Sequence, residues 1–216
     1  MARFLDGTAD YLTIPDHNSL DVGNVFTYAL WFKRNRSGIN YETLFAKGQY
    51  SAVCVFGAGT GNNTLEVYGS YLGVIAKSTN SIADTAWHQT TITKNGSTSF
   101  KIYIDSIDVT GTVTDKTLQS TALKQFIGED QDADVPSVKC FQGSLAEFAV
   151  WNRALTLAEA QGLGKGFAPS FYKNGLRVYF PIMGNNSPER DLKNGLSATL
   201  VGTCAKANHP RIIYPR

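Results

Sequence analysis

The sequence lacks long apolar runs and clusters of like charge. No stretch approaches the roughly 20 consecutive apolar residues that a helix needs to span a bilayer. The 20 lysines and arginines are scattered along 216 residues and leave a formal net charge of only +2. Phosphate binding needs a concentrated basic face. We therefore expect neither a membrane nor a nucleic acid as a partner.

Cysteine is scarce, and a secretion signal is not recognisable. Residues 1–7 contain no apolar core and no small-residue cleavage site, which predicts a protein made in a reducing cytoplasm. The 3 cysteines, Cys54, Cys140 and Cys204, are odd in number and lack metal-ligand spacing. We expect three free and mostly buried thiols, and a single disulfide with one leftover thiol is the alternative.

Catalytic motifs are missing as well. There is no Gly-x-Ser-x-Gly nucleophile motif. The histidines His17, His88 and His209 lie far apart in the chain, which favours structural roles over catalysis. Residues 57–61 are glycine-rich like a phosphate loop but lack the following Lys-Ser/Thr and helix, so they predict a turn. These absences predict a protein that is not an enzyme.

What the sequence does contain is a repeated alternation of apolar and polar residues. Phe100, Ile102 and Ile104 alternate with polar or amphipathic neighbours, as in a strand with one buried face. Similar patterns or half-buried runs recur at residues 25–32, 52–56, 64–68, 145–151 and 176–180. Gly, Asn, Asp and Ser clusters separate them. Many short strands with frequent turns predict an all-β fold, a two-sheet antiparallel β-sandwich.

One short helix and one domain are expected. Thr156 and Glu159 have the spacing of a capping box, and Gly162 predicts the end of the helix about two turns later. Too little chain follows residue 169 for a second core. We therefore predict a single domain over residues 1–207 and an extended C-terminal arm over residues 208–216, which has two prolines.

Two blocks carry a family resemblance. Residues 4–15, with Phe4, Gly7, Asp10 and Tyr11, resemble the opening strand of laminin-G-like domains of the concanavalin A-like lectin/glucanase superfamily. Residues 141–156 resemble the same family's Gly-x-Ile-Asp-Glu-Val strand, followed by Asn-Arg-Ala-Leu-Ser and a short helix. The resemblance implies a jelly-roll sandwich.

The C-terminal part resembles a segment that usually precedes the opening strand in laminin-G-like chains, as if the order were permuted. Residues 176–203 would then complete the same sandwich, with the first and last strands in one sheet. The ending, with Ser187, Pro188 and Glu189 and then His209 and Pro210, is similar to that of laminin-G-like proteins in bacteriophage particles.

Two functional hypotheses follow from these resemblances. The first is a non-enzymatic structural protein of a bacteriophage virion, a capsid decoration or tail-associated component made in the host cytoplasm. Its partners would be other virion proteins and further copies of itself. The alternative is a lectin-like carbohydrate-binding module for host-surface glycans.

Glucanases of this superfamily place two catalytic carboxylates on one strand, with Glu-x-Asp-x-x-Glu or related spacing. No glutamate here has matching acidic neighbours. Glu129 is followed by Asp130 and Asp132, which is the wrong spacing for that motif. The missing motif therefore predicts that the chain is not a glycosidase, and a carboxylate pair assembled from distant strands is the alternative.

The same acidic cluster has two further interpretations. Related pentraxins carry an acidic Ca²⁺ loop at this place, which makes Glu129, Asp130 and Asp132 candidate ligands. Two departures count against it: Gln49 and Tyr50 replace the pentraxin Asp-Asn, and Ala146 stands where the family has its first acidic residue. A solvated acidic loop is the other interpretation. No other cofactor is expected.

Two groups of surface residues remain as candidates for contacts. Tyr41, Tyr50 and Tyr71 lie near predicted turns and could stack on a sugar ring, or cap the sandwich or a subunit contact. In the arm, Ile212, Ile213 and Tyr214 cannot bury one another in an extended backbone. They predict docking on a neighbouring protein, in a homo-oligomer or on a lattice, and the alternative is that the arm folds back over its own sheet.

Overall fold

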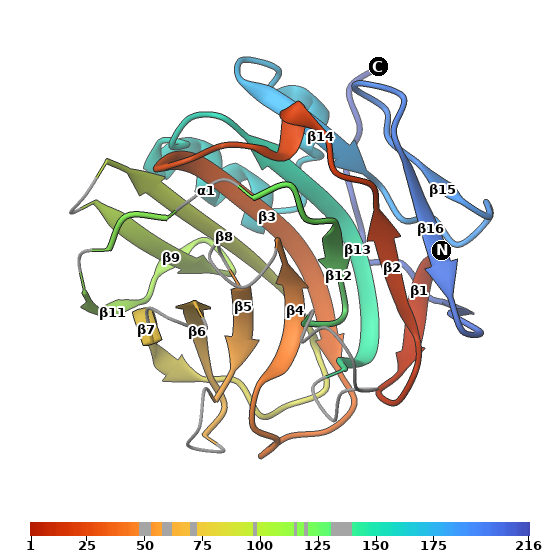
Figure 1. Ribbon diagram of the computed structural model, residues 1–216, viewed down its shortest axis with the longest axis horizontal. Coiled ribbons are helices and arrows are strands. Elements are labelled where there is room, and N and C mark those ends of the chain that lie inside the picture. Colours follow the sequence, from red (N-terminus) through yellow and green to blue (C-terminus); the bar gives the residue numbers. More distant parts are fainter. Residues whose placement is uncertain are drawn as a thin grey trace.

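The chain forms two antiparallel sheets stacked face to face, with one short α-helix (Figure 1). The computed structural model describes residues 1–47, 53–57, 62–69, 73–96, 99–114, 116–118, 121–130 and 140–216. The predicted all-β sandwich is confirmed. Among the described residues, no helix has the length and apolar character needed to cross a membrane.

Sheet A contains eight strands in the described part of the chain. Their order is β10 (Ile107–Asp108), β9 (Phe100–Ile104), β8 (Trp87–Asn95), β3 (Val25–Arg34), β13 (Gln142–Trp151), β1 (Ala2–Asp6) and β17 (Ala205–Ala207), with β14 (Leu176–Phe180) also paired to β13. The patterns at residues 25–32, 100–104, 145–151 and 176–180 are thus strands of one sheet.

Sheet B contains nine strands over the same described ranges. Their order is β11 (Thr110–Val113), β7 (Gly73–Ser81), β6 (Thr64–Gly69), β5 (Val53–Phe56), β4 (Glu42–Ala46), β12 (Gln125–Ile127), β2 (Tyr11–Ile14), β16 (Ser197–Val201) and β15 (Glu189–Arg190).

Alternation along the strands places the core between the two sheets. In β3, Tyr28 and Phe32 face sheet B, and the ring of Tyr28 stacks on Phe45 of β4 with centroids 4.7 Å apart. Side chains two residues apart point to the same face of a strand, so Phe26, Tyr28 and Phe32 line the core side of β3, and Trp31 lies on the other face. The five residues predicted for the core are all buried: Phe100, Ile102, Ile104, Phe148 and Val150.

The two ends of the chain meet along one edge of β13. Strand β1 pairs with residues 142–145 of β13, and β14 pairs with residues 148–151 of the same edge. Between them lies Glu147, which has a φ of 60°. Strand β17 pairs with β1, and β16 pairs with β2 in sheet B. The C-terminal segment therefore belongs to the same two sheets. The last strand, β17, shares sheet A with β1, but it lies beyond the predicted residues 176–203, whose final strand β16 lies in sheet B.

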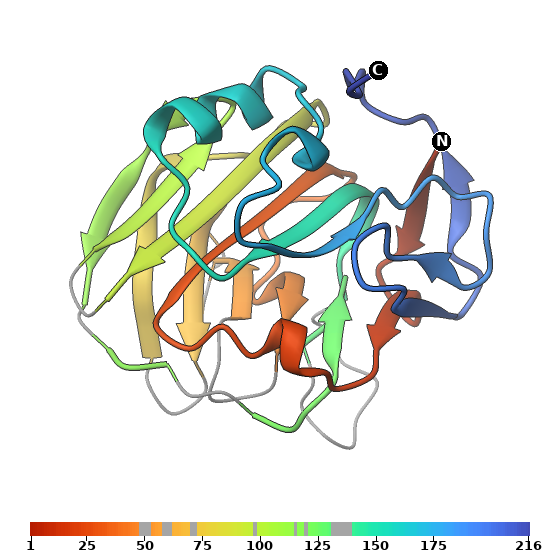
Figure 2. The ribbon, with the colours of Figure 1, turned by 90° about the horizontal axis from the view of Figure 1, so that it is seen from above.

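The helix α1 (Leu157–Gly164) lies on the outer side of sheet A (Figure 2). It begins at the predicted capping box, in which Thr156 accepts from the backbone of Glu159 and Glu159 accepts from that of Thr156. Its Leu163 packs with Trp151 of β13 and Tyr179 of β14. Two 3-10 turns, η1 (Asn18–Leu20) and η2 (Pro169–Phe171), complete the described helices. The three cysteines are buried and do not form disulfides with one another, as predicted.

Candidate functional site

A row of side chains crosses the outer face of sheet A. Phe4 of β1 pairs with Ser144 of β13, Ser144 pairs with Lys33 of β3, and Lys33 pairs with Trp87 of β8. Directly paired residues project to the same face of a sheet. The adjacent row contains the buried core residue Phe32, so the row from Phe4 to Trp87 projects away from the core.

A pocket of about 220 Å³ opens over this row. Its remaining lining residues are Arg34, Asn35, Gly143, Ala207 and Asn208. Sites that enclose drug-sized ligands measure roughly 300–1,000 Å³. This pocket therefore suits a group about the size of a single ring.

Aromatic side chains stand at the two ends of the row. Phe4 and Trp87 are both half-buried, so each keeps part of a ring surface accessible. They lie three strands apart, which corresponds to about 14 Å between backbones at the usual strand spacing. The pocket thus offers flat apolar surface at both ends and polar groups between them.

Apart from Arg34, the polar side chains that line the pocket have no partners among the described residues. Among described residues, neither the Lys33 ammonium nor the Ser144 hydroxyl has a hydrogen-bond partner. The same holds for the Asn35 and Asn208 amides and the Trp87 indole N–H. Polar side chains that converge on a concave surface with free donors and acceptors are typical of ligand sites.

Arg34 lines the pocket, but its guanidinium forms its ion pair on the other side of the sheet. Its guanidinium donates to Glu42 Oε2 from Nε at 3.0 Å and from Nη2 at 2.6 Å. It also lies over the Phe56 ring, 4.1 Å from the centroid. Lys33 is therefore the cation that the pocket presents.

Gly143 brings β13 close to β3 beneath the pocket. A Cβ at this position would collide with the Lys33 carbonyl oxygen and would lie 2.8 Å from Cε1 of Phe141. Its φ of 153° also favours glycine. The absence of a side chain at Gly143 therefore sets the position of the pocket floor.

His88 anchors the strand end that carries Trp87. Its Nδ1 lies 2.6 Å from Asp105 Oδ2, and its Nε2 lies 2.9 Å from Asp84 Oδ1. The hydrogen bond to Asp105 contributes most and, with Asp84, outweighs the effect of burial, so the pKa of His88 rises to about 9. The imidazolium is thus the main form at neutral pH and binds both carboxylates, and these contacts fit the hydrogen-bonded structural histidine that was expected.

Of the three tyrosines predicted as a sugar platform, Tyr41 is described, and it does not line this pocket. Tyr41 packs edge-on against Tyr68 of sheet B, with ring centroids 5.4 Å apart. Tyr50 and Tyr71 lie outside the described residues. The prediction considered only aromatic residues near turns, whereas Phe4 and Trp87 stand in strands, at positions that face outward. The signal that could have revealed them is an aromatic residue at a strand position where the apolar–polar alternation predicts a solvent-facing side chain.

The two described residues of the acidic cluster do not fit the solvated loop that was one interpretation. Glu129 and Asp130 are 9% and 4% exposed, so both carboxyl groups are buried. Asp132 lies outside the described residues. Among the residues that the structure describes, no group of three His, Cys, Asp or Glu side chains is placed to hold a metal ion. A Ca²⁺ site that includes Asp132 remains a prediction.

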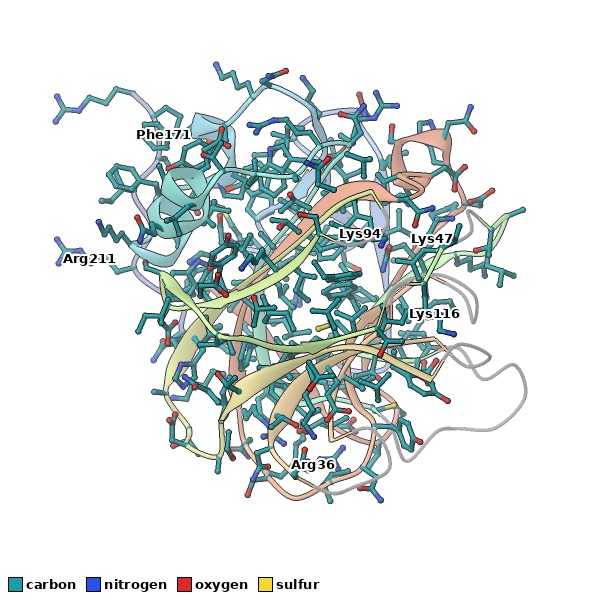
Figure 3. All side chains as sticks on the ribbon, turned by 90° about the vertical axis from the view of Figure 1, so that its left-hand side faces the viewer. Arg36, Lys47, Lys94, Lys116, Phe171 and Arg211 are labelled. Carbon is teal, nitrogen blue, oxygen red and sulfur yellow. The ribbon has the colours of Figure 1, made fainter. Side chains whose placement is uncertain are left out.

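The C-terminal arm is docked on its own domain. The backbone of Ile213 forms a bridge with residues 166–168, in which Ile213 N–H donates to the Gly166 carbonyl at 2.8 Å and Ala168 N–H donates to the Ile213 carbonyl at 2.9 Å. Figure 3 shows Arg211 of the arm and Phe171 of η2 on the same side of the molecule, near α1. The arm therefore folds back on its own domain, as the alternative to docking on a neighbour had it.

The arm also binds the buried carboxylate at the junction of β1 and β14. The Tyr214 hydroxyl donates to Glu147 Oε1 at 2.8 Å, and the Tyr179 hydroxyl donates to Oε2 at 2.6 Å. His209 Nε2 lies 3.3 Å from Oε1. Burial raises the pKa of both tyrosines and the Glu147 charge adds to this, so both remain donors.

The apolar side chains predicted to bind a partner stay accessible. Ile213 is 47% exposed and Tyr214 is 39% exposed, while Ile212 is half-buried. Docking therefore leaves the Ile213 side chain and part of the Tyr214 ring exposed, while the Tyr214 hydroxyl is turned to Glu147. A partner or second copy on this surface remains a prediction.

Comparisons with known proteins place the fold. Residues 6–161 match the model of the family described as the concanavalin A-like lectin/glucanases superfamily. No curated protein matches the chain.

Solved structures share the fold at low sequence identity. A candidate carbohydrate binding protein from Bacteroides ovatus ATCC 8483 is 16% identical with a TM-score of 0.69, and the match covers 95% of this chain but only 62% of that protein's length. Domain 4 of AbnA, a GH43 extracellular arabinanase from Geobacillus stearothermophilus in complex with arabinotriose, is 19% identical with a TM-score of 0.59 over 76% of each chain. The binding domain of Paraclostridial Mosquitocidal Protein 1 is 16% identical with a TM-score of 0.54, over 74% of this chain and 41% of that one.

Proposed function

Because this chain belongs to the concanavalin A-like lectin/glucanases superfamily, we propose that it binds carbohydrate, with the outward pocket of sheet A as the binding site. One observation carries the proposal: the row of Phe4, Ser144, Lys33 and Trp87, in which the aromatic surfaces are accessible and the polar groups have no partner in the described protein. The family alone would not suffice, because one fold hosts many functions.

The chemistry of a sugar ring matches this pocket. A pyranose or furanose ring has apolar C–H faces and an equator of hydroxyl groups. The Trp87 and Phe4 rings offer flat surfaces for the C–H faces. Asn35, Ser144 and Asn208 offer donors and acceptors for the hydroxyl groups. The five side-chain polar groups without protein partners are those of Lys33, Asn35, Trp87, Ser144 and Asn208. On binding, sugar hydroxyl groups would replace the water on these groups, so that none of them is left unpaired.

Binding without hydrolysis is the form of the proposal. Glycosidases use two carboxyl groups that flank the scissile bond. The described lining residues of the pocket include no Asp or Glu. Below the sheet, Glu42 accepts from Arg34 and Arg36. These contacts support a module that holds a glycan and leaves its bonds intact.

The structural neighbours add support for the lectin-like hypothesis. One is a candidate carbohydrate binding protein, and another is a domain of an arabinanase solved with arabinotriose. Nothing in the fold or in these comparisons supports the bacteriophage-virion hypothesis, its virion partners or a homo-oligomer, so these stay untested predictions.

Glycan-array screening followed by titration calorimetry tests the proposal. We expect Trp87→Ala to weaken glycan binding by about tenfold or more, since aromatic anchors dominate such sites. Phe171→Ala is the matched control, because Phe171 is 41% exposed on η2 and lies outside the pocket lining. The absence of any glycan ligand, or equal binding by wild type and Trp87→Ala, would contradict the proposal.

A further inference from the structure

Lys33 stands at the centre of the outward row without a counter-ion. Among the described residues its ammonium has no ion-pair or hydrogen-bond partner. Other cations nearby are paired: Arg34 and Arg36 both bind Glu42, and Arg3 binds Glu189. The lining residues that the structure describes include no carboxylate. The pocket therefore presents one uncompensated positive charge between two aromatic rings.

We infer that the pocket selects a sugar bearing a carboxylate, a hexuronic acid, with Lys33 as the residue that determines this specificity. The inference rests on the proposed carbohydrate-binding function and adds a substrate class to it. Lys33 pairs directly with Trp87 on the neighbouring strand, about 5 Å away. A ring stacked on Trp87 would therefore place a substituent of its rim above Lys33.

The charge of the ligand determines how strongly the Lys33 ammonium binds it. A neutral sugar can offer this ammonium only a hydroxyl acceptor. A carboxylate adds the attraction between opposite charges to that hydrogen bond, because donor and acceptor are then both ionised. The lysine stem is flexible and ends in a point charge, so it can follow a carboxylate on either side of the ring. Neutral sugars would still bind through the aromatic rings and the amides, but more weakly.

The test compares ligands that differ only in charge. Oligosaccharides of galacturonic and glucuronic acid are titrated against their methyl esters, which keep the sugar and remove the charge. We expect wild-type protein to prefer the free acids by about tenfold, and the preference to shrink in high salt. Lys33→Gln should abolish the preference, because the affinity for the free acids should fall to the affinity for the esters. Trp87→Ala should weaken binding of acids and esters alike.

Controls separate this inference from the proposed function. Lys206→Gln removes an exposed lysine of β17 that does not line the pocket, and should keep the preference. Thermal melting of Lys33→Gln should match wild type, because Lys33 is exposed.

Equal binding of acids and esters would overturn the charge selection while leaving carbohydrate binding intact. A preference that survives Lys33→Gln would overturn the role of Lys33, and Lys33-dependent binding of sulfated sugars alone would overturn the carboxylate. Absence of binding to any sugar would overturn both proposals.

Discussion

Trp87 and His88 are consecutive in β8 and face opposite sides of sheet A. Trp87 lines the outward pocket, while the His88 ring lies 5.7 Å from that of Phe32 on the core side. His88 also holds Asp84 and Asp105. The imidazolium and its two carboxylates therefore fix the backbone from which the Trp87 side chain projects.

This histidine makes stability depend on pH. Its pKa is about 9 in the folded protein and about 6.5 in the unfolded chain. Because the pKa is higher in the folded protein, protonation of His88 stabilises the fold. This stabilisation is complete below pH 6.5 and is lost as the pH rises through 9. Screening by solvent limits the effect to about 1 kcal/mol, or roughly 2–4 °C in melting temperature. Melting at pH 6 and pH 10 should show this loss in wild type and not in His88→Gln. Equal pH dependence in both proteins would contradict the assignment.

Gly143 is a second residue on which the pocket depends. Gly143→Ala should lower stability by about 1–3 kcal/mol, because the new Cβ would push β13 away from β3. Glycan affinity should fall with it, since the pocket floor would move. Gly195→Ala is the control: Gly195 has a φ of 72° but meets nothing within 4 Å, so it reports backbone strain alone. Denaturant unfolding that shows equal losses for the two variants would exclude a role for the close approach of the strands.

At the scale of elements, the C-terminal arm links the pocket to a buried carboxylate. Asn208 lines the pocket, and the next residue, His209, contacts Glu147. Burial lowers the pKa of His209, but the hydrogen bond and charge of Glu147 outweigh it and raise the pKa overall. The arm therefore positions one wall of the pocket through its contacts with β13.

Deleting residues 209–216 tests this link. The deletion removes two contacts to a buried carboxylate, so we expect a loss of about 2 kcal/mol and a melting temperature lower by several degrees. Deleting only residues 215–216 keeps Tyr214 and should change little. An unchanged melting temperature together with loss of self-association in ultracentrifugation would instead favour the partner contact predicted for Ile212, Ile213 and Tyr214.

At the scale of the whole molecule, sequence patterns predicted the architecture better than the site. Alternation at residues 100–104 and the capping box at Thr156 depend on local spacing, and both are confirmed. The pocket depends on strand register. Phe4, Lys33, Trp87 and Ser144 come from four strands distant in the chain, and they meet only because those strands pair residue by residue. Short-range sequence patterns do not show which strands pair or in which register, so the site could not be predicted from residue spacing alone.

The shared edge of β13 also determines the order in which the protein can fold. Strand β1 has its partners at residues 142–145 and 205–207, and Arg3 donates to Glu189, 186 positions away. Contacts of such long sequence separation need large loops to close before they stabilise anything, which slows folding. As the ribosome makes the chain, β1 emerges early and stays unpaired until β13 follows more than 130 residues later. The strand that supplies Phe4 to the pocket is thus among the last to gain its neighbours, and the pocket can form only when the sandwich is nearly complete.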